Sequence, residues 1–207
     1  MDRYFVMKNS AEYALMAADV RLNRVMHAYL IVSPDGGMAD ALCDLFLSLC
    51  VFGNADKESV SRVKTLSADI MRLPHGDKVL TSDVEELTET VYFTPTELDR
   101  KYYVIDKCDT MNETCQNKLL KILEEPPSSV IILIKCMSAE SLLPTVLSRV
   151  KRVDVKPLTE SAVTEYLSGI SGDETAVYLA AALSQGYLFK GEKVLAEPKY
   201  KEIFALT

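Results

Sequence analysis

Apolar and polar residues alternate along the first three quarters of the chain in blocks that favour short buried strands and helices in turn. Four apolar runs of strand length occur, with a fifth candidate after them, at residues 27–32, 68–74, 101–106, 129–136 and 151–155. Helical spacing of apolar residues occupies the segments between them, at residues 9–26, 38–52, 81–91 and 112–125. Near-continuous apolar strands alternating with helices are typical of a parallel sheet covered on both faces, so the pattern predicts an α/β domain.

The pattern changes after Lys156, where only helical spacing remains. The helical segments lie at residues 160–170, 173–186 and 200–207. We therefore predict two domains, an α/β domain over residues 1–155 and a small helical domain over residues 156–207. The last segment has only about two helical turns, so we expect the chain to be a fragment of a longer protein.

Composition narrows the possible functions. The 207 residues include 48% hydrophobic residues, and 23 basic against 30 acidic side chains give a net charge of −7. That balance argues against a chain that coats nucleic acid or an anionic membrane with its whole surface. The longest apolar runs are far shorter than the ~20 residues of a membrane span, and residues 1–13 lack the pattern of a signal peptide. We predict a cytoplasmic location and no contact with a membrane.

Five cysteines, an odd number, lie at positions 43, 50, 108, 115 and 136. They form no CxxC pair and have no histidine at ligand spacing, so we predict free thiols and neither a disulfide framework nor a metal site.

The stretch "SPDGGMAD", residues 33–40, joins the first predicted strand to the next helix, which is where a phosphate-binding loop would lie. Gly36 and Gly37 allow a tight turn there. A working loop also needs a Lys for the β/γ-phosphates and a hydroxyl for Mg²⁺, but Ala39 and Asp40 occupy those places. The carboxylate would repel a triphosphate, so the residues predict either a site that has lost ATP binding or an ordinary turn.

The strand "YYVID" ends in Asp106, a position from which a carboxylate can hold Mg²⁺. Lys107 follows it, and a cation cannot serve as a general base at neutral pH unless its pKa is strongly lowered. An acid at the end of a strand is also common as a simple solvated residue, so this pair alone favours no catalytic site.

The most specific motifs are "VIDKCDTMNETCQNKLLKILEEPP" and, after an apolar strand, "LLPTVLSR". In this order they resemble the AAA+ domains of bacterial DNA polymerase III clamp-loader subunits, most of all those of delta-prime type. The resemblance covers residues 27–188. It implies a parallel-sheet, P-loop NTPase-like domain followed by a small helical lid domain.

Relatives of this family carry "GPxGxGKT" where this chain has "SPDGGMAD". Ser33 thus replaces the first glycine, Met38 the third, Ala39 the lysine and Asp40 the threonine. Delta-prime-type subunits tolerate this loss because they act as a rigid stator, so the resemblance implies no bound cofactor.

Two further family features are also degraded. Only Cys50 remains of the four-cysteine zinc module of many relatives, so no metal is expected. The second sensor arginine falls near Phe189, beside Lys190.

Ser148 and Arg149 match the family's Ser-Arg-Cys motif, with Val150 in the cysteine position. In the family this arginine reaches from one subunit into the ATP site of its neighbour. The chemistry fits, because a guanidinium is permanently charged and its planar fork matches phosphate oxygens. Without the motif, a surface arginine at a helix end would be the simpler interpretation.

Within "KLLKILEE" we expect the apolar residues Leu119, Leu120, Ile122 and Leu123 to pack on the sheet. Lys118 and Lys121 lie on the other side of that helix. They are as compatible with a solvated face as with contact to a DNA backbone.

The resemblance implies a non-catalytic stator subunit of the DNA polymerase III clamp loader, which supports ATP-dependent loading of the sliding clamp onto primed DNA. Its expected partners are the motor and delta-type subunits of a hetero-oligomeric ring, with the sliding clamp and primer–template DNA as further candidates. The relatives' collar domain would follow residue 207. Two alternatives stay open: an active AAA+ motor or replication-factor loader with a divergent phosphate loop, and an interaction module unrelated to replication.

Overall fold

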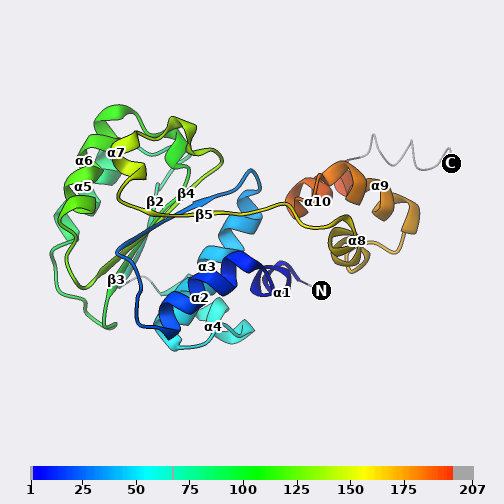
Figure 1. The fold of residues 1–207 in the computed structure, drawn as a ribbon, viewed down its shortest axis with the longest axis horizontal. Coiled ribbons are helices and arrows are strands. Elements are labelled where there is room, and N and C mark those ends of the chain that lie inside the picture. The colour runs from blue at the N-terminus through cyan, green and yellow to red at the C-terminus, as the bar shows by residue number, and fades with distance from the viewer. Residues whose placement is uncertain (1, 67, 198–207) are drawn as a thin grey trace.

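The fold is built on a five-stranded parallel sheet, seen in a computed structural model that describes residues 2–66 and 68–197 (Figure 1). The strand order is β2-β3-β4-β1-β5, and every neighbouring pair is parallel. The strands are β1 (Ala28–Val32), β2 (Ile70–Leu73), β3 (Lys101–Ile105), β4 (Val130–Cys136) and β5 (Lys151–Asp154). The predicted α/β class and all five predicted strands are confirmed.

Helices cover both faces of this sheet and form a separate group after it (Figure 1). One face carries α1 (Arg3–Lys8), α2 (Ala11–Arg21), α3 (Gly36–Phe52) and α4 (Lys57–Thr65). The other carries α5 (Thr81–Thr90), α6 (Glu113–Glu124), α7 (Pro144–Leu147) and the short 3₁₀ turns η1 (Cys108–Thr110) and η2 (Ala139–Ser141). After β5 come α8 (Glu160–Ser168), α9 (Glu174–Ser184) and α10 (Leu188–Ala196).

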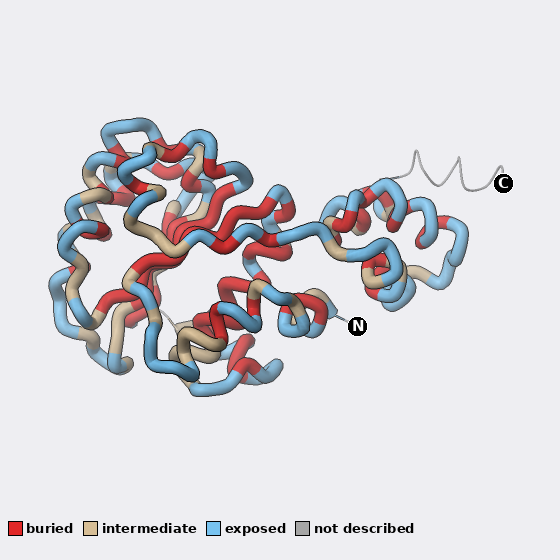
Figure 2. Tube along the Cα trace, viewed as in Figure 1, coloured by how far each residue is buried: buried red, intermediate tan, exposed pale blue. Residues whose placement is uncertain are grey.

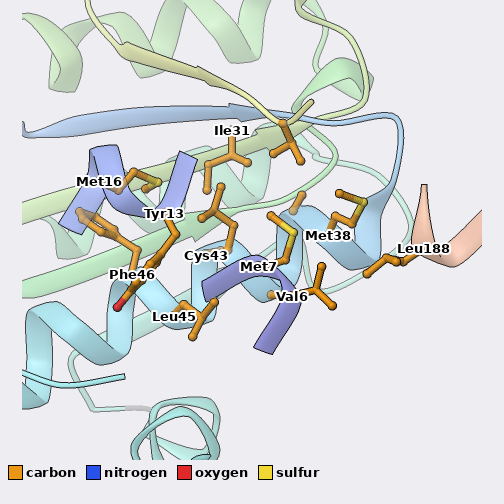
Figure 3. Close-up of a cluster of buried hydrophobic side chains, with 14 of the residues drawn as sticks. Val6, Met7, Tyr13, Met16, Ile31, Met38, Cys43, Leu45, Phe46 and Leu188 are labelled. Atoms are coloured by element: carbon orange, nitrogen blue, oxygen red, sulfur yellow. The ribbon is translucent and has the colours of Figure 1, made fainter. Parts of the chain in front are cut away.

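The apolar strands are buried on both faces because successive side chains point to opposite helical layers (Figure 2). Tyr29 and Ile31 of β1 pack with the helices α1–α4, whereas Leu30 between them packs with the layer of α5–α7. Figure 3 shows the first of these clusters, in which Met7 and Phe46 are fully buried. The central helix of that layer, α3, starts at Gly36, within the predicted phosphate loop of residues 33–40.

Several helix boundaries differ from the prediction. The predicted helix 9–26 begins after the N-cap Ser10 and ends at Arg21, because Asn23 adopts a left-handed conformation with φ 52°. Helix α3 begins at Gly36 instead of residue 38, so both loop glycines are helical.

Four helices, α1, α4, α7 and α10, were not predicted. Helix α1 is only six residues long. Helix α7 has only four residues. Helices α4 and α10 have nine residues each, of which only three are buried. The predicted helix at residues 200–207 lies outside the described residues.

The helices after β5 follow a linker that packs against the turn between α9 and α10. Gly186 in this turn has φ +85°, and a Cβ there would lie 2.5 Å from the carbonyl oxygen of Leu158. The Leu158 N–H also donates to the Gly186 carbonyl at 2.9 Å. Only glycine fits this approach. The division into domains at residue 155 stays a prediction.

None of the described helices is by itself long and apolar enough to cross a membrane. Helices α3 and α4 together reach the length and apolar composition of a span, but they are bent by 93° at the break between them.

Candidate functional site

The stretch of residues 33–40, called the loop below, lies at the carboxyl ends of the strands and comprises the β1–α3 connection and the first turn of α3. The buried Ser33 donates its backbone N–H to the carbonyl of Cys136 at 3.0 Å, which ties the loop to β4. Its Oγ donates to the Asp35 carbonyl at 2.9 Å and accepts the Asp35 N–H at 3.1 Å. A serine in the first position therefore closes the loop on itself.

Asp35 is the residue that the sequence analysis missed in this loop. Its carboxylate accepts the N–H of Met38 in the first turn of α3 at 3.0 Å and the N–H of Phe189 at the start of α10 at 2.7 Å. The residue is 2% exposed. Burial raises the pKa of the Asp35 carboxyl, against the opposing effect of these N–H donors. The N-terminus of α3, the place where a phosphate would bind, is thus occupied by the chain's own carboxylate.

The segments around the loop approach it closely. A Cβ added at Gly37 would lie 3.1 Å from Arg3 Nη1 and 3.3 Å from Asp35 Oδ1, whereas Gly36 has open space around it. The space left between α1, the loop and α10 is too small for a water molecule; it is lined by Arg3, Asp35, Gly37, Leu188, Phe189 and Glu192. Helices α1 and α10 therefore close over the loop.

Lys135, near the end of β4, holds the two predicted acidic positions together. Its ammonium forms an ion pair with Asp40 of α3 and lies 3.4 Å from the Asp106 carboxylate that follows β3. The lysine side chain is only 8% exposed, whereas the aspartate side chains are 54% and 44% exposed. The structure thus brings Asp40 and Asp106 together around a cation, where an active site would place Mg²⁺ and the loop lysine.

Sequence reasoning also missed Lys135, although a signal was present: it is the one charged residue within the buried run "VIILIKC". The sequence indicated Lys107 instead, but Lys107 Nζ lies 3.8 Å from Asp77 Oδ1. Only the backbone N–H of Lys107 serves the site, donating to Asp106 Oδ1 at 2.8 Å.

The charge of Lys135 is stabilised in the folded protein. Burial alone would lower the pKa of its ammonium, but neighbouring groups outweigh burial and the net direction is upward. Cys43 also lies close, but burial raises the pKa of its thiol to about 12, so the thiol is neutral at pH 7. The counter-charges at neutral pH are therefore Asp40 and Asp106.

At position 39, alanine is 3% exposed and packs in the core, so it supplies no charge to this edge.

Among residues 2–66 and 68–197, no three His, Cys, Asp or Glu side chains are grouped as a metal site would require. All five cysteines are free, and only Cys50 is not fully buried. The groups that would face phosphate and Mg²⁺ in a working site are here satisfied by one another.

Arg149 lies on a different side of the molecule, in the turn between α7 and β5. Its Nη2 is 2.8 Å from the Glu124 carboxylate at the end of α6. Nη1 donates to the Thr145 carbonyl at 2.8 Å and to Ser148 Oγ at 3.2 Å. Ser148 Oγ itself donates to the Thr145 carbonyl at 3.0 Å, so the two predicted residues form one hydrogen-bonded unit.

The strand register places Arg149 and the loop at opposite ends of the strands: Arg149 lies at the amino edge of the sheet and the loop at the carboxyl edge. Lys151, at the start of β5, pairs with Tyr29, and Asp154 at its end pairs with Val32, directly before the loop. At about 3.3 Å per residue, the strand separates the two sites by on the order of 10 Å or more. Arg149 is therefore not placed to serve the loop of its own chain.

A shallow, open cavity of about 650 Å³ lies beside Arg149 at this amino edge. Its lining comes from the end of the α2–β1 connection and from the α7–β5 turn; it consists of Asp19, Arg24, Met26, His27, Ser148, Arg149, Val150 and Lys151.

Helix α6 packs as expected, since Leu119, Ile122 and Leu123 are buried and Leu120 is partly buried. Lys118 on its outer side forms an ion pair with Glu85. Contact of this lysine face with DNA stays a prediction.

Neither Phe189 nor Lys190, the residues at the position of the second sensor, directs a positive charge at the loop. Phe189 contributes its backbone N–H to Asp35, and Lys190 Nζ donates to Gln185 Oε1 at 2.5 Å.

Comparison with known proteins agrees with this architecture. The family described as "DNA polymerase III, delta subunit" matches residues 8–159. The Bacillus subtilis DNA polymerase III subunit delta′ is 29% identical over 161 residues, which are 74% of this chain and 49% of that protein. The Haemophilus influenzae subunit tau/gamma is 27% identical over 81% of this chain and 26% of that protein. The chain thus spans half or less of the length of these relatives.

Solved structures support the fold. A Thermotoga maritima DNA polymerase III gamma subunit-related protein superimposes with a TM-score of 0.61, at 20% identity, over 87% of this chain and 57% of that one. At this identity the likeness establishes the AAA+ fold alone. The family match covers most of the chain and shows that it belongs to the DNA polymerase III delta-subunit family.

Proposed function

We propose that this chain is a stator: a subunit that binds no nucleotide itself, assembles with ATPase subunits of a clamp loader, and donates Arg149 to the ATP site of a neighbour. Its role would be to support ATP-dependent loading of the sliding clamp onto primed DNA, as part of a DNA polymerase holoenzyme in the cytoplasm. The motor and delta-type subunits would be its direct partners, and the clamp and the primer–template would be contacted through the assembled ring.

The proposed absence of nucleotide binding rests on one observation, the internal pairing of charges around the loop. Lys135 lies between Asp40 and Asp106, while Asp35 fills the N-terminus of α3. A nucleotide would have to displace an internal cation from the metal position and an internal anion from the phosphate position, and Asp40 would then repel it. Loss of the loop lysine removes the compensating attraction.

The proposed contact with a neighbour's ATP site rests on the position of Arg149. It is at the edge of the sheet opposite its own loop, with its side chain 34% exposed. Nε makes no hydrogen bond within the described residues, and Nη2 meets only the half-exposed Glu124. Part of the guanidinium fork is therefore free to meet phosphate oxygens of another subunit.

The test combines two measurements. Calorimetric titration of the chain with Mg·ATP should show no binding up to millimolar nucleotide, with an ATPase subunit of the loader as positive control. In a loader reconstituted with its ATPase subunits and clamp, Arg149→Ala should lower DNA-dependent turnover at the served site by on the order of 10³-fold.

Arg152→Ala is the matched control, because Arg152 is an exposed arginine of β5 paired only with Asp154, and it should leave turnover unchanged. Micromolar ATP affinity of the chain alone would favour the active-motor alternative. Unchanged turnover with Arg149→Ala in every assembly would favour an interaction module unrelated to replication.

A further inference from the structure

The cavity beside Arg149 is cationic although the chain as a whole is acidic. Its lining holds three cationic side chains, Arg24, Arg149 and Lys151, against the single carboxylate of Asp19. The chain carries a net charge of −7. A concave surface of this sign on an acidic protein favours an anionic ligand.

The three cations are not equally available. Lys151 Nζ contacts both oxygens of Asp19, at 2.8 and 2.6 Å, and the same carboxylate accepts the hydroxyl of Tyr29 at 2.7 Å. Arg149 faces Glu124 on one side. Lys151 is therefore neutralised within the chain and Arg149 partly so.

Arg24 is exposed, and within residues 2–66 and 68–197 its guanidinium forms no ion pair or hydrogen bond. Its backbone is nevertheless fixed, because Asn23 makes a left-handed turn and the Arg24 N–H donates to the Asp19 carbonyl at 2.8 Å. The turn places a cation with unused hydrogen-bond donors at the rim of the cavity.

His27 adds a second unused polar group. Its Nε2 is buried and has no hydrogen-bond partner in the described part of the chain. Buried polar atoms are normally paired, so an unpaired one in a cavity lining indicates a missing partner.

We propose that this cavity receives the terminal phosphates of the nucleotide bound by the neighbouring subunit, and that Arg24 is a second cation that binds them together with Arg149. The proposal rests on the proposed in trans role of Arg149 and extends it from one residue to a site. Arg149 acts on the charge that develops during hydrolysis, whereas Arg24 contributes to binding of the ground-state phosphates.

This division predicts different kinetic effects in the reconstituted loader. Arg24→Ala should raise the KM for ATP at the served site by on the order of ten-fold with a smaller change in kcat, because a lost charge-assisted hydrogen bond weakens binding by about that factor. Arg24→Lys should restore KM to within about three-fold, since the charge is kept. Arg21→Ala is the matched control: Arg21 is exposed on α2 three residues earlier and does not line the cavity.

The outcomes separate the two proposals. If Arg149→Ala lowers kcat but Arg24→Ala behaves like Arg21→Ala, the phosphate site is wrong and the stator role stands. If Arg149→Ala has no effect, the in trans role itself fails. If Arg24→Ala weakens subunit association in sedimentation experiments while KM stays unchanged at saturating subunit, the cavity takes an acidic side chain of the neighbour and the phosphate site is overturned.

Discussion

The two edges of the same sheet handle charge in opposite ways. At the carboxyl edge, Lys135 pairs with Asp40 and Asp106, and Asp35 accepts backbone N–H groups at the starts of α3 and α10. At the amino edge, Arg149 is held in place but keeps donors that the chain does not use. This difference is what the proposed function requires: a loop that binds no nucleotide and an arginine that can reach a neighbouring subunit.

The difference lies in burial as well as in pairing. Lys135 is almost fully buried and Asp35 is 2% exposed, whereas Arg149 is one-third exposed. Buried charges depend strongly on their partners, but exposed pairs contribute little to stability. Substitutions at the carboxyl edge should therefore affect folding, and those at the amino edge should affect the neighbour's chemistry.

The largest expected effect is at the amino edge. Arg149→Lys keeps the charge but loses the planar fork, so turnover at the served site should still fall at least about 100-fold. Thermal unfolding of the isolated chain should be unchanged. Arg152→Lys provides the control, and equal turnover for the two variants would mean that a point charge is sufficient.

At the carboxyl edge, the double variant Asp40→Asn/Asp106→Asn should lower the free energy of unfolding by about 3 kcal/mol, because it leaves the ammonium of Lys135 buried without a counter-charge. Lys135→Met should cost less, since both carboxylates stay half-exposed to water. Urea unfolding at pH 7 measures both. A larger loss for Lys135→Met would contradict the role assigned to the cation.

The stability of the unmodified chain and that of the double variant Asp40→Asn/Asp106→Asn should respond to pH with opposite signs. In the unmodified chain the pKa of Lys135 is raised, so its stabilising contribution is complete below pH ~10 and is lost as pH rises through the folded-state value. In the double variant, unopposed burial should lower that pKa, so stability should increase as pH rises toward ~10. Parallel pH profiles of the two proteins would rule out this account.

A smaller effect is expected for Asp35→Ala, which removes one helix cap and the bond to Phe189 together. The expected loss is about 2 kcal/mol. Asp56→Ala, which removes the N-cap of α4, should cost less than Asp35→Ala and serves as the comparison. Hydrogen exchange should show faster opening at the start of α10 for Asp35→Ala only.

The smallest effect is expected for Glu124→Gln. Its pair with Arg149 is exposed, so stability should fall by no more than about 0.5 kcal/mol, and the difference should vanish in 1 M salt. The adjacent exposed residue supplies the control, Glu125→Gln. A large, salt-independent loss would show that the amino edge is built like the carboxyl edge.

Local pattern was enough to predict the sheet but not every helix. The strands were recognisable because burial on both faces requires continuous apolar runs. Helix α4 is short and mostly polar, with only two buried apolar residues, Val60 and Val63, and α10 contains Gly191, a poor helix former. Tertiary contacts, of α4 with α3 and of α10 with α9, stabilise what local propensity does not specify.

Some residues of the candidate site could likewise be predicted from local sequence, and others could not. Ser148 and Arg149 could be predicted from a motif because they are adjacent in sequence. The ion pair of Lys135 with Asp40 joins residues far apart in the chain, and the bond from Asp35 to Phe189 spans 154 positions. Such contacts depend on strand order and on the position of α10, which no local pattern encodes.

The bond between Asp35 and Phe189 also has a mechanical consequence. It fastens the helices after β5 to the start of α3 through a carboxylate that belongs to the chain. A ligand at this hinge could dissociate or be hydrolysed, and the angle between the two parts would then follow its turnover. A covalently attached anion has no such cycle, so under the proposed stator role this contact between α3 and α10 would be the same with and without nucleotide.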